Sequence, residues 1–342
     1  MADSKVKKTT RIKPTMIKDV YANNFKEEMM KIAHLVEEFP FIGMDTEFPG
    51  IVYSKENQQL RGLSNYQLTK LNVDSLKLIQ VGITLSDKNG YYPEETCTWQ
   101  FNLKFDVNTD LHQQSSIQLL ISSGIEFESH SSKGIPHLLF GEYMIVSGLL
   151  LNPDVYWITF HGIYDFAYLL KVITNSKLPE LEKEFYESLD LYFGTYFDLR
   201  HLIQFSDYSR GSLQKLALEC NIQRIGTQHQ AGSDSIVTLM AFFKIVNEVF
   251  SSTPVTNYKN VLFHYIEKDD VEFDSSRVPN YYNQNYQSHF QNLRGSMHMY
   301  MYPYYNSLSG MGNLPINNMN NLTGMNNMMY PHISFDDKKK DE

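Results

Sequence analysis

The sequence has only two cysteines among its 342 residues, Cys97 and Cys220, and they form no Cys-x-x-Cys pair. A thiolate zinc site and a disulfide framework are therefore not expected, and the cysteines are most simply reduced, buried thiols of an intracellular protein. No run reaches the roughly 18 uncharged apolar residues that a membrane-spanning helix needs. The N-terminus MADSKVKKTT lacks the apolar core of a signal peptide. We therefore expect a protein of the cytoplasm and nucleus that has no membrane partner.

Positive charge is also scarce, because 30 Lys and Arg stand against 39 Asp and Glu, a formal net charge of −9. Such a chain does not bind nucleic acid by bulk electrostatic attraction. A nuclease remains compatible with this charge, because a carboxylate metal site adds negative charge that its ions offset. Any hold on nucleic acid is then expected from metal ions, stacking aromatic rings and a few local cations.

The composition divides the chain into three parts. Residues 1–16 are polar and basic, which predicts a disordered N-terminal arm. Residues 17–268 alternate short apolar runs with amphipathic ones, which predicts one α/β domain, a mixed sheet flanked by helices. Between residues 280 and 330 the only Lys, Arg, Asp or Glu is Arg294, and Asn, Met, Tyr and Gly dominate. We therefore expect residues 269–342 to form a disordered, low-complexity tail.

Hydrophobic periodicity predicts the elements of the middle part. A helix is expected over about 24–38, capped by the Asn23–Asn24 pair and stopped by Pro40. The predicted strands cover 41–45, 76–86, 97–105 and 157–161, and residues 195–203 form a short strand or the start of a helix. Further helices are predicted over 138–151, 164–173, 212–220 and 233–250, the last with Ser233 as its cap.

Asp45 and Glu47 end the first apolar run and lie two residues apart. That spacing places both side chains on one face of a strand. Neighbouring carboxylates repel and raise each other's pKa unless a cation lies between them, and the residues around this pair carry no positive charge. A divalent metal ion is the simplest resolution, although an Asp-x-Glu pair on an exposed strand often binds nothing.

Two later segments carry further candidates. Asp165 falls in the first turn of the helix after strand 157–161, where a carboxylate also stabilises a helix N-terminus. His161, at the end of that strand, is either a structural histidine or a contact to nucleic acid. His229 lies in a loop and Asp234 opens the last helix, so the histidine can approach a water molecule without binding a metal ion.

Together these residues predict a metal-dependent nuclease. Carboxylates are the hard oxygen ligands that hold Mg²⁺ or Mn²⁺. Two such ions can clamp the attacking and leaving oxygens of a phosphodiester, and a histidine can take the proton from water.

In order and structural context the five residues match the DEDDh pattern of 3′→5′ exonucleases. The surrounding segments resemble the CAF-type, or POP-type, poly(A) deadenylases, the nuclease subunits of the CCR–NOT complex. The resemblance runs from about residue 17 to 250 and is carried by MDTEFPG, LKLIQVGITLSD, WQFNLKF, YDFAYLLK, RIGTQHQAGSDS and MAFFKI. One departure is FHGIYDF in place of the FHSGYDF typical of the family, which puts Ile163 beside the site.

The resemblance implies an RNase-D-like or RNase-H-like α/β fold and a 3′→5′ exoribonuclease that shortens mRNA poly(A) tails and releases 5′-AMP. It also implies two divalent ions, Mg²⁺ or Mn²⁺. Asp45 bridges the ions, Glu47 and Asp234 complete one site, and Asp165 holds the second ion. His229 is then the general base.

The expected substrate is poly(A) RNA, because a splayed single-stranded 3′ end can enter a recessed cleft and stack on aromatic or apolar groups. Phe48, Pro49 and His161 are the candidate substrate contacts. The resemblance also implies docking to a Not-type scaffold subunit and a second deadenylase. Two alternatives stay open: a scaffold subunit of a messenger-RNA complex with incidental activity, and a DEDDh exonuclease that acts on DNA or short oligonucleotides.

Overall fold

The computed structural model describes residues 17–263 of the chain. The predicted arm, 1–16, and the predicted tail, 269–342, lie outside the described residues. None of the helices in the described part combines the length and the apolar character needed to cross a membrane.

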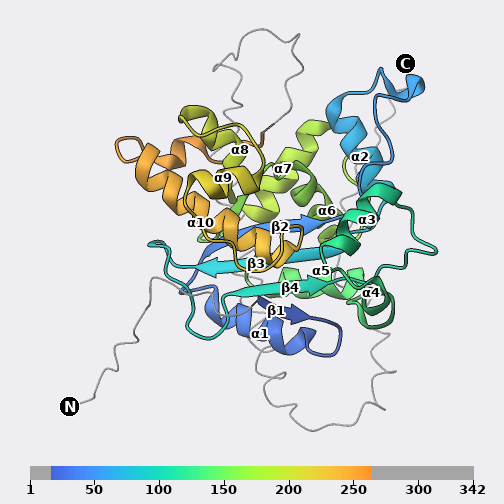
Figure 1. The fold of residues 1–342 in the computed structure, drawn as a ribbon, viewed down its shortest axis with the longest axis horizontal. Coiled ribbons are helices and arrows are strands. Elements are labelled where there is room, and N and C mark those ends of the chain that lie inside the picture. The colour runs from blue at the N-terminus through green and yellow to red at the C-terminus, as the bar shows by residue number, and fades with distance from the viewer. Residues whose placement is uncertain (1–16, 264–342) are drawn as a thin grey trace, which may run out of the picture. The chain divides into compact units, whose positions relative to one another are not determined.

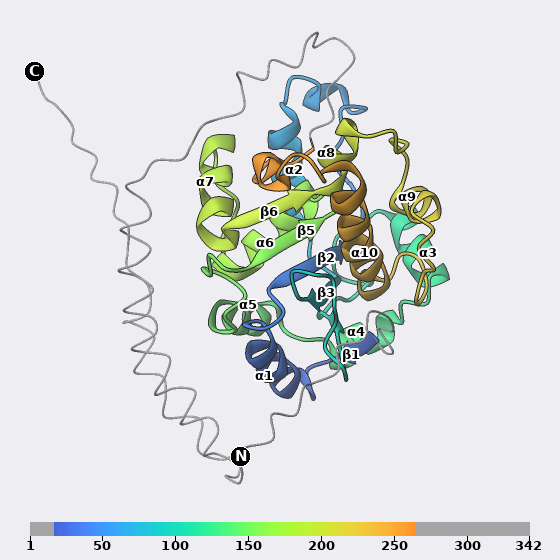
Figure 2. The same ribbon diagram turned by 90° about the vertical axis from the view of Figure 1, so that its left-hand side faces the viewer.

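A six-stranded mixed sheet forms the central layer, with the strand order β1-β4-β3-β2-β5-β6. Strand β2 is parallel to β5, and β5 is parallel to β6, whereas β3 is antiparallel to both β2 and β4. Figure 2 shows this succession from β6, near the top, to β1, near the bottom. The strands are β1 (Ile17–Val20), β2 (Phe41–Glu47), β3 (Gln80–Ser86), β4 (Thr98–Asn102), β5 (Tyr156–Thr159) and β6 (Thr195–Asp198) (Figure 1).

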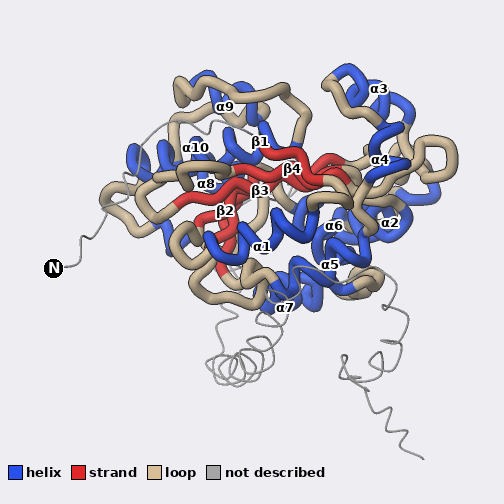
Figure 3. Tube along the Cα trace, turned by 90° about the horizontal axis from the view of Figure 1, so that it is seen from below, coloured by secondary structure: helices blue, strands red, loops and turns tan. Residues whose placement is uncertain are grey.

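Helices cover both faces of the sheet. Figure 3 shows α8, α9 and α10 on one side of the strands and α1, α5, α6 and α7 on the other. The expected α/β fold, a mixed sheet flanked by helices, is confirmed. The helices are α1 (Phe25–Leu35), α2 (Asn65–Ser75), α3 (Gln114–Ser122), α4 (Phe127–Lys133), α5 (His137–Val146), α6 (Ile163–Thr174), α7 (Glu182–Phe193), α8 (Leu199–Leu202), α9 (Leu213–Glu219) and α10 (Ala231–Val249).

The central strands are buried on both faces. Every residue of β3 and β4 is buried, and the polar residues that alternate with the apolar ones, such as Gln80, Thr84 and Gln100, are hydrogen-bonded. On one face Phe25, Phe140 and Phe166 contribute to the main core, and on the other Leu239 and Phe242 of α10 pack in a second core. The sheet is therefore a rigid base for side chains at its edge.

Three details differ from the predictions. Helix α1 ends at Leu35, well before Pro40, and Asn24 makes no side-chain cap bond; its Oδ1 instead accepts the N–H of Tyr21 at 2.8 Å. Strand β2 runs on through the acidic pair to Glu47. Strand β1 was not predicted, because its four residues follow a basic segment and pair with β4 from far along the chain.

Helix α10 approaches the sheet more closely than side chains would normally allow. A Cβ atom on Gly82 of β3 would lie 1.9 Å from the carbonyl oxygen of Ala231, and one on Gly43 of β2 would lie 2.5 Å from that of Ser235. Glycine at both positions lets the helix backbone rest directly on the strands. This contact fixes the distance between the start of α10 and strand β2.

Candidate functional site: a carboxylate cluster at the sheet edge

The site lies where parallel strands end. Because β2, β5 and β6 run in the same direction, their carboxyl ends meet at one edge of the sheet. Glu47 is the last residue of β2, His161 follows β5, and Asp198 is the last residue of β6. Segments more than 100 residues apart in sequence are thereby brought together.

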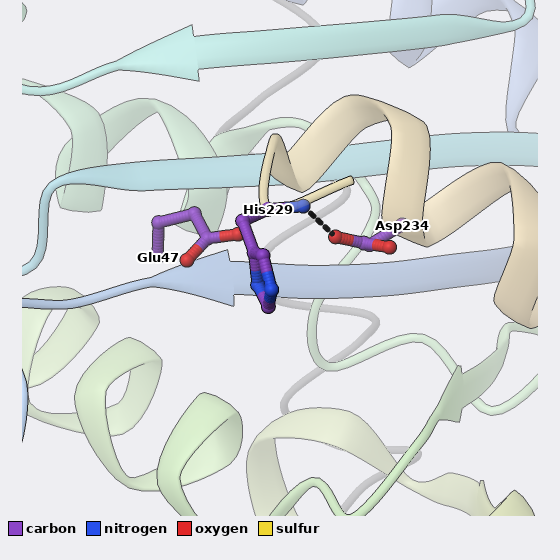
Figure 4. Close-up of side chains that lie close together, drawn as sticks. All are labelled: Glu47, His229 and Asp234. Carbon is purple, nitrogen blue, oxygen red and sulfur yellow. Dashed lines mark hydrogen bonds between the residues drawn. The ribbon is translucent and has the colours of Figure 1, made fainter. Parts of the chain in front are cut away.

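Glu47, His229 and Asp234 form the most compact group of possible ligands among the described residues. One ligand atom from each lies within 4.8 Å of the others. Figure 4 shows the Glu47 carboxylate, at the end of β2, pointing toward His229, which lies in the loop before α10. Asp45 lies two residues before Glu47 in the same strand and so faces α10 as well.

Asp165 approaches the cluster from the opposite face of β2. It is buried in the first turn of α6, as predicted from the sequence. Its Oδ1 accepts a hydrogen bond of 2.6 Å from Oγ1 of Thr46. Thr46 alternates with Asp45 and Glu47 along the strand, so its side chain points toward α6.

The carboxylates share one electrostatic environment. Burial raises the pKa of Asp45 well above its usual range, and the charges of Asp234, Asp165 and Glu47 raise it further. Burial, then Asp234 and Asp165, raise the pKa of Glu47 in the same way. Burial also raises the pKa of Asp165 to about 7, against the hydrogen bond from Thr46. Converging oxygen ligands whose ionised forms are this disfavoured fit a divalent cation, which would relieve their repulsion.

The backbone of His229 is fixed by a hydrogen bond to Asp234. Its φ angle is 61°, in the left-handed region, and its N–H donates to Oδ2 of Asp234 at 2.9 Å. The amide nitrogen of Gln228 lies 3.2 Å from Nε2 of the ring. The histidine therefore has a fixed backbone, and its ring lies beside Gln228, Glu47 and Asp234.

The first turn of α10 is capped by glutamines from the sheet. Gln80 of β3 accepts the N–H of Ala231 at 3.2 Å, and Gln100 of β4 accepts the N–H of Gly232 at 3.0 Å. Both also donate to Oε1 of Gln230. The prediction that Ser233 caps this helix was wrong: α10 begins two residues earlier, at Ala231. The glutamine network orients the turn that carries the last carboxylate.

His161 lies at the edge of the site in a constrained turn. Its φ angle is 62°, and its N–H donates to Oδ1 of Asp198 at 2.8 Å. The buried Asp198 also accepts the N–H groups of Gly162, Arg200 and Phe263. The ring of His161 packs edge-on against Phe263. Asp198 thus fixes the turn that leads into α6.

The other substrate candidates lie deeper than expected. Phe48 is half-buried and stacks on Tyr164 and Tyr168, with ring centroids 5.3 and 5.0 Å apart. Pro49 is buried, and its carbonyl accepts the N–H of Gln113 at 2.8 Å. Their contact with a substrate stays a prediction. Ile163, the departure noted in the sequence, is the first residue of α6 and belongs to the main core.

Sequence reasoning overlooked several residues that shape the site. Thr46 is only one of the uncharged residues around the acidic pair, and Asp198 falls within the short strand or helix start predicted at 195–203. Arg224 lies in the motif RIGTQHQAGSDS, where a single cation ten residues before Asp234 was the available signal. Gln80 and Gln100 gave none, because a polar residue that alternates with apolar ones along a strand does not reveal its partner.

A mixed sheet with helices on both faces, and a carboxylate cluster beside a histidine at its edge, define a nuclease. Residues 20–142 match the family described as CAF1 family ribonuclease. The chain is 42% identical over 252 residues to poly(A) ribonuclease pop2 of Schizosaccharomyces pombe, an alignment that covers 72% of this chain and 74% of that protein. The chain therefore belongs to the CAF1 family of ribonucleases.

Solved structures agree with this assignment. The Mg²⁺- and Mn²⁺-bound form of S. pombe Pop2p matches with a TM-score of 0.69 over 72% of this chain and 98% of that chain, at 42% identity. CAF1 co-crystallised with the yeast NOT1 MIF4G domain matches with a TM-score of 0.62 over 72% of this chain and 96% of that chain, at 28% identity.

Proposed function

We propose that this chain is a metal-dependent 3′→5′ exoribonuclease that shortens poly(A) tails and releases 5′-AMP. One observation carries the proposal: Asp45, Glu47, Asp165 and Asp234 converge beside His229, and burial raises the pKa of the first three. Membership of the CAF1 family and the name of the S. pombe relative, poly(A) ribonuclease, support the choice of substrate.

Two divalent ions, Mg²⁺ or Mn²⁺, fit this set of oxygen ligands. Asp45 would lie between them, with Glu47 and Asp234 completing one site and Asp165 holding the other. When bound, the ions supply Lewis-acid polarisation of the phosphodiester and offset the charge that develops on its oxygens. The metal-bound form of S. pombe Pop2p supports the choice of ions.

The side chains supply proton transfer and orientation. His229 accepts the proton of the water that attacks phosphorus, the bond to the 3′-oxygen breaks, and 5′-AMP is released. Its ring suits this role because it lies beside the carboxylates of Glu47 and Asp234. Thr46 holds Asp165, and the backbone N–H of His229 holds Asp234, so neither carboxylate has to reorient during hydrolysis. We infer that His161, which follows β5, contacts the RNA.

We also infer that the chain works within a complex, with a Not-type scaffold subunit and a second deadenylase, in the cytoplasm and nucleus. The likeness to a CAF1 chain that was co-crystallised with the NOT1 MIF4G domain supports the scaffold partner.

The test is hydrolysis by the purified full chain. RNA with a labelled 5′ end and a poly(A) tail is incubated with Mg²⁺, Mn²⁺ or excess EDTA, beside the same RNA with a mixed-sequence tail and a DNA oligonucleotide. Stepwise shortening that releases 5′-AMP, faster on the poly(A) tail and abolished by EDTA, is expected. Equal degradation of DNA would indicate a broader exonuclease, and no hydrolysis under any condition would favour a scaffold subunit.

A further inference from the structure

Arg224 brings a positive charge to the carboxylate cluster. It lies in the loop between α9 and α10, and its Nη1 donates to Oδ1 of Asp234 and, at 3.0 Å, to Oγ of Ser233. Its Nε donates to Oε1 of Gln214 at 2.8 Å. Burial and the neighbouring carboxylates raise the pKa of Asp45, and the charge of Arg224 acts against them.

The contact with Arg224 continues to the histidine. Arg224 engages one oxygen of Asp234, and the backbone N–H of His229 donates to the other oxygen at 2.9 Å. Asp234 is therefore held from both sides, between a guanidinium and the loop of the proposed base. A carboxylate fixed in this way cannot turn about its terminal bond without losing one of the two donors.

The environment of Arg224 argues against a purely stabilising role for this side chain. The side chain is only 12% exposed, and its Nη2 is buried without a hydrogen-bond acceptor among residues 17–263. A buried ion pair with an unsatisfied donor adds little to stability compared with an apolar side chain of the same size. The feature that an apolar replacement could not supply is a positive charge next to the cluster.

We propose that Arg224 is a positioning residue of the hydrolysis reaction: it orients Asp234, and through it His229, and serves as the cluster's built-in counter-cation. This inference rests on the proposed function, because it assumes that the cluster binds divalent ions and cleaves RNA. It predicts that a bound ion partly replaces the charge of Arg224 but does not replace its orienting role. Stability and turnover should therefore respond differently when the guanidinium is removed.

The experiment uses the full chain with Arg224→Gln, Arg224→Lys and Arg224→Ala. Two control variants are Ser233→Ala, which removes the other acceptor of Nη1, and Arg210→Gln, which changes an exposed arginine. The melting temperature is measured in EDTA and in saturating Mn²⁺, and kcat and KM are measured on a poly(A) RNA. Arg224→Ala is also assayed with guanidinium chloride, at a concentration that leaves wild type folded, against NaCl of equal ionic strength.

In EDTA, Arg224→Gln should lower the melting temperature by on the order of 5–10 °C. Saturating Mn²⁺ should restore at least half of that loss in melting temperature. In Mn²⁺, kcat should fall by about 10–100-fold, the usual cost of losing a group that orients a metal ligand, while KM stays within about threefold. Arg224→Lys should keep more stability than turnover, because an ammonium lacks the fork geometry of arginine. Guanidinium, but not NaCl, should raise the turnover of Arg224→Ala.

Two results would overturn the inference. One is a loss in melting temperature of Arg224→Gln that is equal with and without Mn²⁺, and the other is a kcat within about threefold of wild type in that variant when folded. Arg224 would then only link the loop to α10 structurally. If Arg224→Gln does not fold, the deciding measurement is whether guanidinium raises the turnover of Arg224→Ala. A lack of rescue also overturns the inference. The two proposals fail separately. Wild type that neither cleaves RNA nor is stabilised by Mn²⁺ refutes the proposed function, whereas an active wild type beside an unaffected Arg224 variant refutes only this inference.

Discussion

Thr46 donates a hydrogen bond of 2.6 Å to Asp165, although the two residues are 119 positions apart in the sequence. Thr46 lies between Asp45 and Glu47, so one short stretch of β2 provides two carboxylates on one face and, on the other, the donor that holds a third. The spacing of the acidic pair is therefore linked to the position of Asp165 on α6.

Thr46→Val keeps the shape of the side chain and removes this donor. Because the Asp165 carboxylate is buried, losing its partner should lower the free energy of unfolding by about 1–3 kcal/mol. Affinity for Mn²⁺ should fall by about 10–100-fold. Titration calorimetry measures the affinity, with Thr46→Ser as the control that keeps the hydroxyl. Indistinguishable Val and Ser variants would show that the hydrogen bond does not position Asp165.

The stability of the metal-free protein should decrease as pH rises. Burial raises the pKa of Asp165 to about 7, whereas an unfolded aspartate titrates near 3.9. Between these values the folded state binds more protons, so stability is fully present below about pH 4 and is lost by about pH 7. The loss amounts to a few kcal/mol, since each unit of pKa shift is about 1.4 kcal/mol. Denaturant unfolding in EDTA at pH 5, 6, 7 and 8 measures it, and stability that rises across this series would contradict the shift.

Asp45→Asn should separate folding from catalysis. Its carboxylate is disfavoured by burial and by the charges of Asp234, Asp165 and Glu47. Removing that charge should stabilise the metal-free protein by about 1–3 kcal/mol at pH 8 and less at pH 5, while abolishing hydrolysis. Thermal unfolding and an RNA assay measure the two effects. Asp207→Asn, at an exposed position, is the control, and wild-type turnover in Asp45→Asn would remove Asp45 from the site.

His229→Asn should slow cleavage by ~10²–10⁴, the usual range for losing a general base. The backbone N–H that donates to Asp234 is retained, so affinity for Mn²⁺ and for RNA should stay close to that of wild type. Single-turnover kinetics and calorimetry measure the two quantities, with the exposed His34→Asn as the control. Binding lost together with cleavage would make His229 a structural residue, and unchanged cleavage would leave the site without its base.

Gly82→Ala should perturb the site from a distance. A Cβ atom there would lie 1.9 Å from the carbonyl oxygen of Ala231, so α10 would have to move away from β3. Overpacking of this kind costs about 1–3 kcal/mol, and a shift of about 1 Å at Asp234 can reduce turnover by about 10²-fold. Gly62→Ala is the matched control, because its Cβ would meet nothing within 4 Å. Equal behaviour of the two variants would show that the close approach does not set the position of α10.

The parts of this structure that local sequence patterns determine were predictable. The apolar runs of β2, β3 and β5 and the periodicity of α5 and α6 gave these elements to within a few residues. Residues 195–203 were predicted as a strand or the start of a helix, and both occur, because β6 passes directly into α8. Asp165 was placed in the first turn of α6 for the same local reason.

The features that depend on distant partners were not predictable in this way. Ser233 has the right residue type for a helix cap, but Gln80 and Gln100 supply the cap of α10 from the sheet, and Ser233 instead accepts a hydrogen bond from Arg224. Phe48 has the right type for a stacking surface and its contact with RNA stays a prediction, whereas its stacking on Tyr164 was not indicated by any local pattern. Both contacts depend on residues far along the chain.

The hydrogen bonds of Asp198 limit how far the polypeptide can be trimmed. Its side chain accepts the N–H of Phe263 at 3.0 Å and also the N–H groups of the turn at His161 and Gly162. A chain cut before residue 263 would leave this buried carboxylate short of one donor and weaken its hold on the turn that leads to Asp165. An enzyme shortened at that end should thus bind its ions less tightly before it loses any strand of the sheet, and a fusion partner is better attached after residue 263 than before it.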